Sequence, residues 1–147
     1  MSKGRMSDLY ETDILEWSQH QAALPRRLAA GERVNDQVDW KNVIDEVESV
    51  GKEQVHAVSL LLLQAMAHRL KAIGWPDSRD AENWQAVARL FCAQAADRFA
   101  PSMRKKLNLA RIYRRARRAL PAAMDGLPPQ PLPDECPWTL DDLLAEP

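Results

Sequence analysis

Hydrophobic residues recur at helical spacing through most of the chain, most densely between residues 39 and 73. They form a stripe at i, i+4 and i+7, with members Trp40, Ile44, Val47, Val58, Leu62 and Ala65. Gly51 interrupts the stripe at a cost of only about 1 kcal/mol. The pattern therefore predicts one helix over residues 39–73, roughly 50 Å long. The stripe spans more than 100° of the helix surface, so we expect other helices to cover it.

Both ends of this predicted helix carry recognisable signals. Asp39 can cap the free amides of the first turn, and Val38 and Val43 have the spacing of a hydrophobic staple. Gly74 can adopt the left-handed conformation that ends many helices, and Pro76 forbids continuation.

Four further elements flank the central helix. A helix from Asp8 to about Gly31 contains Pro25, where we expect a kink or a break. Others are predicted over residues 81–99 and 103–124, and Thr139 can cap a short helix over residues 140–145.

The pattern as a whole predicts an all-α, single-domain bundle of four main helices around one very long central helix. Residues 1–7 are expected to be a disordered lead-in, residues 8–124 the helical bundle, and residues 125–147 a proline-rich tail packed on the bundle. At 147 residues the chain is long enough for a real core.

Composition and charge indicate where in the cell the protein is located, and they argue against a membrane-spanning or disulfide-stabilised protein. The net charge of −1 gives no overall attraction to nucleic acid or membrane, and no apolar run reaches membrane-spanning length. Cys92 and Cys136 are too few for a disulfide scaffold. A cytoplasmic protein is the expectation.

A strongly basic segment lies within the predicted helix over residues 103–124. Eight cations occur there without an intervening acid, at Arg104, Lys105, Lys106, Arg111, Arg114, Arg115, Arg117 and Arg118. One interpretation is contact with phosphate groups of nucleic acid, which would use Arg104, Lys105, Arg111, Arg114, Arg115 and Arg118. The other is a solvated helix that faces acidic neighbours such as Asp45, Glu46, Glu48 and Glu53.

A second group of residues gathers where the central helix ends. If the first helix packs antiparallel to the central one, Asp13 could approach His68. The resulting group would be either a buried ion pair that fixes helix register or a ligand site, and its members would be Asp13, Trp17, His68, Lys71, Trp75 and Trp84.

No catalytic, metal or cofactor motif is recognisable. Glu46 and His68 share a helix face but would lie roughly 33 Å apart along one unbroken helix, so we do not expect them to act as a pair. The three histidines match no metal-ligand spacing, and Gly-rich phosphate loops and nucleophile motifs are missing. We expect no cofactor and no bound metal.

The order of several short segments resembles a bacterial family catalogued as domain of unknown function 29. The segments are Tyr10-Glu-Thr-Asp13 with Trp17, Asp39-Trp40, Asp45-Glu-Val-Glu-Ser-Val-Gly51, His68-Arg-Leu-Lys71, Trp84, Pro101-Ser-Met-Arg104, Tyr113 and Cys136-Pro137. The resemblance covers roughly residues 8–145 and implies an all-helical bacterial protein with no established activity, cofactor or catalytic residue. Two positions depart from the expected pattern: Arg69 replaces an apolar residue and Cys92 replaces an arginine.

These observations favour a small binding or interaction protein without catalytic activity. Another protein, or a second copy of the chain, is the first choice of partner. Nucleic acid bound through the basic helix is the alternative, and an unrecognised hydrolase is a more distant one. We expect no membrane partner.

Overall fold

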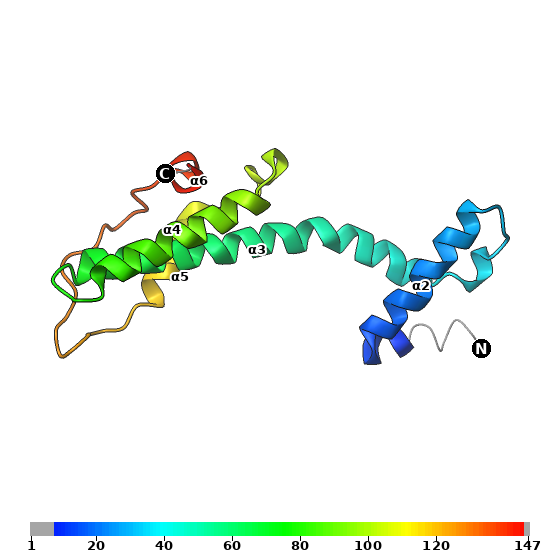
Figure 1. The fold of residues 1–147 in the computed structure, drawn as a ribbon, viewed down its shortest axis with the longest axis horizontal. Coiled ribbons are helices and arrows are strands. Elements are labelled where there is room, and N and C mark those ends of the chain that lie inside the picture. The colour runs from blue at the N-terminus through cyan, green and yellow to red at the C-terminus, as the bar shows by residue number, and fades with distance from the viewer. Residues whose placement is uncertain (1–7, 146–147) are drawn as a thin grey trace. The chain divides into compact units, whose positions relative to one another are not determined.

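The computed structural model describes residues 8–145, and the predicted lead-in over residues 1–7 lies outside them. The described chain is entirely helical apart from turns and extended segments, with an isolated β-bridge between Met124 and Leu127. The main elements are α2 (Ile14–Ala29), α3 (Trp40–Gly74), α4 (Ala81–Arg98), α5 (Leu109–Arg118) and α6 (Leu140–Leu144). An all-α chain with a long central helix is therefore confirmed (Figure 1).

The central helix α3 runs without interruption from Trp40 to Gly74, as the sequence predicts. Around it the chain divides into two compact units, the N-terminal unit up to Lys52 and the C-terminal unit from Glu53 onward. This division falls within α3, where the hydrophobic pattern gives no sign of a boundary.

In the N-terminal unit, α2 lies against the start of α3 and the residues just before it. The indole Nε1 of Trp17 donates a hydrogen bond to Asp39 Oδ2 at 3.2 Å, and Gln21 Oε1 accepts one from the Asp39 amide at 2.9 Å. Leu24 is buried with Val34 and Val38, and Val43 packs against this cluster. The predicted staple pair thus belongs to the small core of this unit.

The first helix breaks at Asp13 instead of Pro25. Residues 8–12 are helical, and Asp13 then caps α2 by accepting a hydrogen bond from the Glu16 amide at 3.1 Å. Pro25 lies inside α2, which continues to Ala29 because Leu24 and Leu28, on either side of the proline, pack into the apolar cluster. Gly31 has the positive φ of 91° expected at the end of this element.

The apolar stripe on the first part of α3 is exposed, against expectation. Helix α2 and the residues before it meet α3 at Asp39, Val43 and Glu46, where Glu46 accepts a hydrogen bond from the Tyr10 hydroxyl. Each of the stripe residues Trp40, Ile44 and Val47 comes directly after one of these three contact residues in the sequence. Consecutive residues of a helix are about 100° apart around its axis, so the stripe lies on a neighbouring face. The polar contacts at Asp39 fix α2 on the first of these two faces, which leaves the second uncovered.

The C-terminal unit holds the larger core. Figure 1 shows α4 running back along the second part of α3, and the short α6 lies against α4. Val58, Leu62, Met66 and Leu70 of α3 are fully buried, and Tyr113 of α5 and Leu143 of α6 complete the core. The predicted helix over residues 81–99 is confirmed as α4.

The fourth predicted helix is much shorter than expected. A 3-10 turn, η2 (Pro101–Met103), precedes it, and the Asn108 side chain starts α5 afresh by accepting a hydrogen bond from the Arg111 amide. Arg118 ends α5 because Pro121 cannot continue a helix and disfavours helical backbone at the residue before it.

The tail returns along the C-terminal unit and meets the end of α3. Asp125 and Gly126 both have positive φ, 51° and 78°, and form a tight two-residue turn between Met124 and Leu127. Gly74 is the last helical residue and has no left-handed backbone, so that prediction was wrong. A Cβ on Gly74 would lie 3.0 Å from Pro129 Cβ, so this glycine instead permits close approach of the tail.

Helix α6 begins as predicted. Thr139 Oγ1 accepts a hydrogen bond from the Asp142 amide at 3.1 Å, and Asp142 Oδ2 accepts one from the Thr139 amide at 2.9 Å. This reciprocal capping box fixes the short helix, so that Leu140 and Leu143 enter the core.

Candidate binding sites

The residues predicted to gather at the end of α3 are distributed over both units. Asp13 and Trp17 belong to the N-terminal unit, where Asp13 caps α2 and Trp17 bonds to Asp39. His68 belongs to the C-terminal unit, and its Nδ1 lies 2.7 Å from the Gln64 carbonyl oxygen. Because a carbonyl can only accept, Nδ1 carries the proton. Each residue thus has local partners, and a meeting of Asp13 with His68 stays a prediction.

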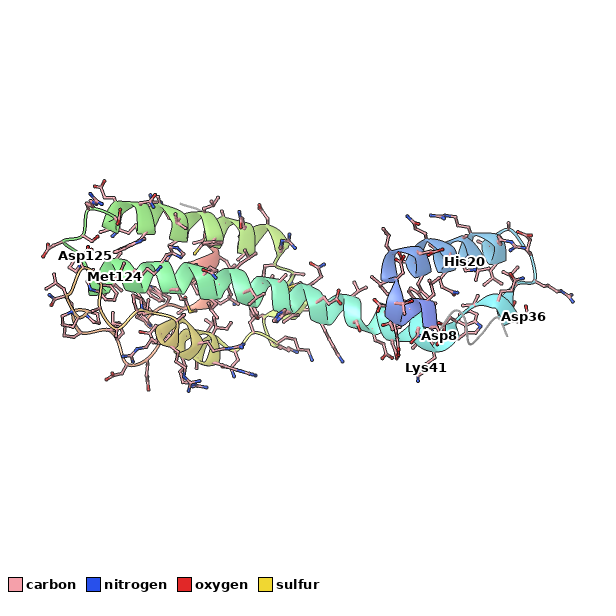
Figure 2. The ribbon with its side chains drawn as sticks, turned by 90° about the horizontal axis from the view of Figure 1, so that it is seen from below. Asp8, His20, Asp36, Lys41, Met124 and Asp125 are labelled. Carbon is pink, nitrogen blue, oxygen red and sulfur yellow. The ribbon has the colours of Figure 1, made fainter. Side chains whose placement is uncertain are left out.

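Two of the predicted tryptophans do lie together. Trp75 and Trp84 are buried in one cluster with Ala72, and Met124 packs against it. Trp75 Nε1 also donates a hydrogen bond to the Leu127 carbonyl oxygen at 2.9 Å. Figure 2 shows Met124 and Asp125 at this end of the C-terminal unit. Trp75 therefore ties the tail to the end of α3.

A hollow of about 750 Å³ lies beside this cluster, between the α3–α4 turn and the proline-rich tail. Its lining includes Trp75, Pro76, Met124, Leu127 and Pro129. The indole N–H of Trp75 is already engaged by Leu127, and the lining combines this apolar and proline surface with the polar residues Asp77, Ser78, Arg79, Asp125 and Gln130. The sequence singled out Trp75 but gave no sign that the tail would form the opposite wall.

His68 and Lys71 do not join the tryptophan cluster. The His68 ring lies 5.6 Å from the Phe91 ring of α4, in a tilted arrangement. Lys71 is half-buried, and no carboxylate among residues 8–145 lies within 4.0 Å of its ammonium group.

The basic segment is displayed on the outside of the C-terminal unit. Helix α5 buries Ile112, Tyr113 and Ala116, which turns its arginines toward solvent. Two of the eight cations form ion pairs, Arg104 with Asp141 at 2.9 Å and Arg117 with Asp134 at 3.8 Å. For the other six, the part of the chain that the structure describes provides no carboxylate within 4.0 Å. Both acids that do pair belong to the tail, and neither is among the acidic residues of α3 that the sequence suggested as neighbours.

A smaller cavity of about 300 Å³ lies between α3, α4 and α6, and sequence reasoning missed it. Arg69, Arg89, Cys92, Asp97 and Asp142 contribute to its lining. Arg69 Nη2 lies 3.8 Å from Cys92 Sγ, so the two positions that depart from the expected family pattern contact each other. The difference of Arg69 and Cys92 from the expected family pattern was the sequence signal that could have pointed to this cavity.

Burial and charge set the properties of the groups around this cavity. Burial raises the pKa of the Cys92 thiol, which the nearby Arg69 guanidinium lowers in part. The hydrogen bonds from Thr139 lower the pKa of Asp142, and Arg69 contributes more weakly in the same direction. Cys92 is therefore a neutral thiol near pH 7, and Asp142 is ionised.

Two kinds of feature, a cluster of metal ligands and a membrane-spanning helix, are missing among the described residues. Residues 8–145 contain no group of three histidine, cysteine, aspartate or glutamate side chains placed to hold a metal ion. No described helix combines the length and apolar character needed to cross a membrane.

These features define an all-helical protein with a long central helix and several candidate binding surfaces. The family model for "Domain of unknown function DUF29" matches residues 9–147, so the chain belongs to this family. Among solved structures, it is similar to an alpha-helical protein of unknown function from Rhodospirillum rubrum, with 26% identity and a TM-score of 0.69 over 93% of this chain and 89% of that one. No curated protein matches the sequence.

Proposed function

We propose that this protein is a non-catalytic interaction protein that binds a helix of a partner protein through the exposed stripe Trp40, Ile44 and Val47. The exposed fractions of these residues, which carry the proposal, are 48%, 50% and 69%. Val50, which is 58% exposed, extends this apolar surface on the side of Val43. Single exposed apolar residues are ordinary, whereas several along one helix face are typical of a protein-binding surface.

The shape of the stripe suits a helix as partner. Trp40, Ile44 and Val47 have the i, i+4, i+7 spacing with which one helix packs against another. Gly51 continues the same line, and no heavy atom other than its own neighbours lies within 4 Å of a Cβ built on it. A partner helix could therefore approach closely there, while Trp40 offers the large aromatic side chain common among energetically dominant contacts.

Charge favours a basic partner over a second copy of the same face. Asp45 and Glu48 are exposed beside the stripe. The N-terminal unit has seven lysine and arginine residues against ten aspartate and glutamate residues, a net charge of −3. Antiparallel pairing of two copies would place acids against acids, so we expect lysines or arginines beside the apolar residues of the partner helix.

Site-specific photocrosslinking in the native cell tests this proposal. A benzophenone amino acid at Val47 should capture one partner protein reproducibly, whereas the same probe at the exposed Lys52, on the opposite side of α3, should not. Ile44→Glu combined with Trp40→Glu should abolish capture from Val47, whereas Ile44→Leu combined with Trp40→Phe, which keeps the stripe apolar, should retain it. Equal capture from Val47 and Lys52, or no capture from either, would contradict the proposal.

Binding of nucleic acid through α5 and the residues before it is a second candidate, supported by the six cations that lack an acid partner. The helix already buries its apolar face, so its exposed side offers charge and hydrogen-bond donors. Lysine and arginine in this arrangement suit a phosphate backbone, and the absence of an exposed aromatic residue on α5 argues against base stacking.

Salt dependence distinguishes this candidate from the first. If about five phosphates are contacted, the logarithm of the affinity for double-stranded DNA should fall with the logarithm of salt concentration with a slope of about −4 to −5. Arg114→Glu with Arg118→Glu should abolish binding, whereas Arg26→Glu with Arg33→Glu, an equal change of charge on the N-terminal unit, should preserve it. Failure to bind DNA or RNA at physiological ionic strength would reject the candidate.

A further inference from the structure

We infer that the cavity between α3, α4 and α6 is a binding site for a small organic monocarboxylate, held by Arg69 and Arg89. The site is independent of the proposed partner surface, because all of its lining residues belong to the C-terminal unit. Its volume of about 300 Å³ is at the lower end of the range for small-molecule sites.

The α4 wall of the cavity follows from the sequence of that helix. Arg89, Cys92, Ala93, Ala96 and Asp97 occur at i, i+3, i+4, i+7 and i+8 and therefore share one face. The two alanines in the middle leave the space, with Arg89 towards one end and Asp97 at the other, roughly 12 Å apart along the helix axis.

Arg69 reaches the cavity from α3 and has strong donors without a strong acceptor. Its guanidinium lies over the Trp138 ring, 5.2 Å from the ring centroid, and Nη2 approaches the Cys92 thiol at 3.8 Å. A guanidinium has five N–H donors, and a thiol is a weak acceptor. Within residues 8–145 no carboxylate oxygen lies within 4.0 Å of Arg69, although the side chain is half-buried. A ligand carboxylate would accept two of these donors in the planar, bidentate geometry that guanidinium favours.

The charges of the lining select a singly charged ligand. Two arginines and two aspartates line the cavity, and one of these acids, Asp142, already accepts a hydrogen bond from the Thr139 amide. A doubly charged phosphate would meet this nearly neutral lining unfavourably, whereas a single carboxylate can accept the Arg69 donors, which no described carboxylate contacts within 4.0 Å. Ala93, Ala96 and Leu144 provide apolar surface for a short aliphatic chain.

Titration of the full-length protein with pentanoate, followed by NMR, tests this inference. We expect saturable shifts of the Ala93 and Ala96 amides and of the Arg69 Nε–H, with pentanamide, the uncharged analogue, binding at least ~10-fold more weakly because it offers no charge-assisted acceptor. Inorganic phosphate should neither bind nor compete. Equal binding of pentanoate and pentanamide, or no shifts at tens of millimolar pentanoate, would overturn the inference. So would stronger binding of phosphate.

Substitutions of single arginines test whether pentanoate binds in this cavity. Arg69→Met keeps an aliphatic stem over Trp138 and should weaken pentanoate binding at least ~10-fold. Arg79→Met removes an arginine outside this cavity and should have no effect. If Arg69→Met does not fold by circular dichroism, Arg89→Met provides the second test and should weaken binding by a smaller factor. Wild-type affinity in a folded Arg69→Met variant, or in Arg89→Met where that variant replaces it, would overturn the assignment.

Discussion

The indole of Trp17 donates its N–H to the carboxylate of Asp39 across 22 residues of sequence, and this bond sets which face of α3 the first helix covers. Asp39 also accepts a hydrogen bond from the Asn42 side chain at 2.9 Å, and its own amide donates to Gln21. These contacts hold α2 beside Asp39, Val43 and Glu46. The apolar stripe Trp40, Ile44 and Val47, one residue further along, is left exposed.

Removing the Asp39 carboxylate should loosen the N-terminal unit. Asp39→Ala leaves the Trp17 N–H and the Asn42 amide without their acceptor in a buried position, at an expected cost of about 2–3 kcal/mol. Hydrogen exchange of the α2 amides is the measurement, since it reports on this unit separately. Asp36→Ala, at an exposed position of η1 (Asn35–Gln37), is the control, with an expected change within about 0.5 kcal/mol. Similar protection in both variants would show that the network contributes little.

The two glycines of α3 should respond to alanine in opposite directions. Gly51→Ala introduces a methyl group into open space within a helix and should stabilise the fold by about 0.5–1 kcal/mol. Gly74→Ala places a Cβ 3.0 Å from Pro129 Cβ and should destabilise it by about 1 kcal/mol. Thermal unfolding gives the sign of each change. Exchange of the Gln130 amide, which donates to the Gly74 carbonyl oxygen at 2.7 Å, should accelerate in Gly74→Ala and remain unchanged in Gly51→Ala.

The two cysteines should differ in reactivity toward iodoacetamide near pH 8. Burial raises the pKa of Cys92, so little thiolate forms and access is poor, whereas Cys136 is only half-buried. We expect alkylation of Cys92 to be at least ~10-fold slower, with equal labelling after denaturation as the control. Because the folded pKa is raised, the stability that the neutral thiol contributes is present below the unfolded pKa and is lost as pH rises through the folded value. Faster labelling of Cys92 than of Cys136 would contradict this account.

The cap of α6 should weaken in acid. Hydrogen bonds from Thr139 lower the pKa of Asp142 below its ordinary value of 3.8. The stabilisation by this carboxylate is therefore present above its unfolded pKa and is lost as pH falls through the lower folded value. Amide exchange or NMR shifts of Leu143 should report loosening of α6 in that acidic range. Asp142→Asn should remove the transition, and if the transition persists in that variant, another group is responsible.

Local pattern alone determined several elements of this protein. The α3 span, the α4 span and the Thr139 cap depend on apolar spacing and capping chemistry within a few residues, which the sequence displays directly. The basic segment was also visible as a run of cations without acids. Its helical boundaries were not visible, because the apolar spacing continues past both the Asn108 cap, where α5 begins, and Pro121, before which it ends.

Tertiary structure decided which surfaces are covered and which side chains meet. A helix face that is apolar in sequence can be buried or exposed, and the difference on α3 depends on the long-range bonds from Trp17 and Gln21 to Asp39. The cavity at Arg69 brings together residues of α3, α4 and α6 that are separated by up to 75 positions, between Arg69 and Leu144. Periodicity describes one element at a time, so it could not place these side chains together. The packing of α4 and the capped α6 against α3 does so.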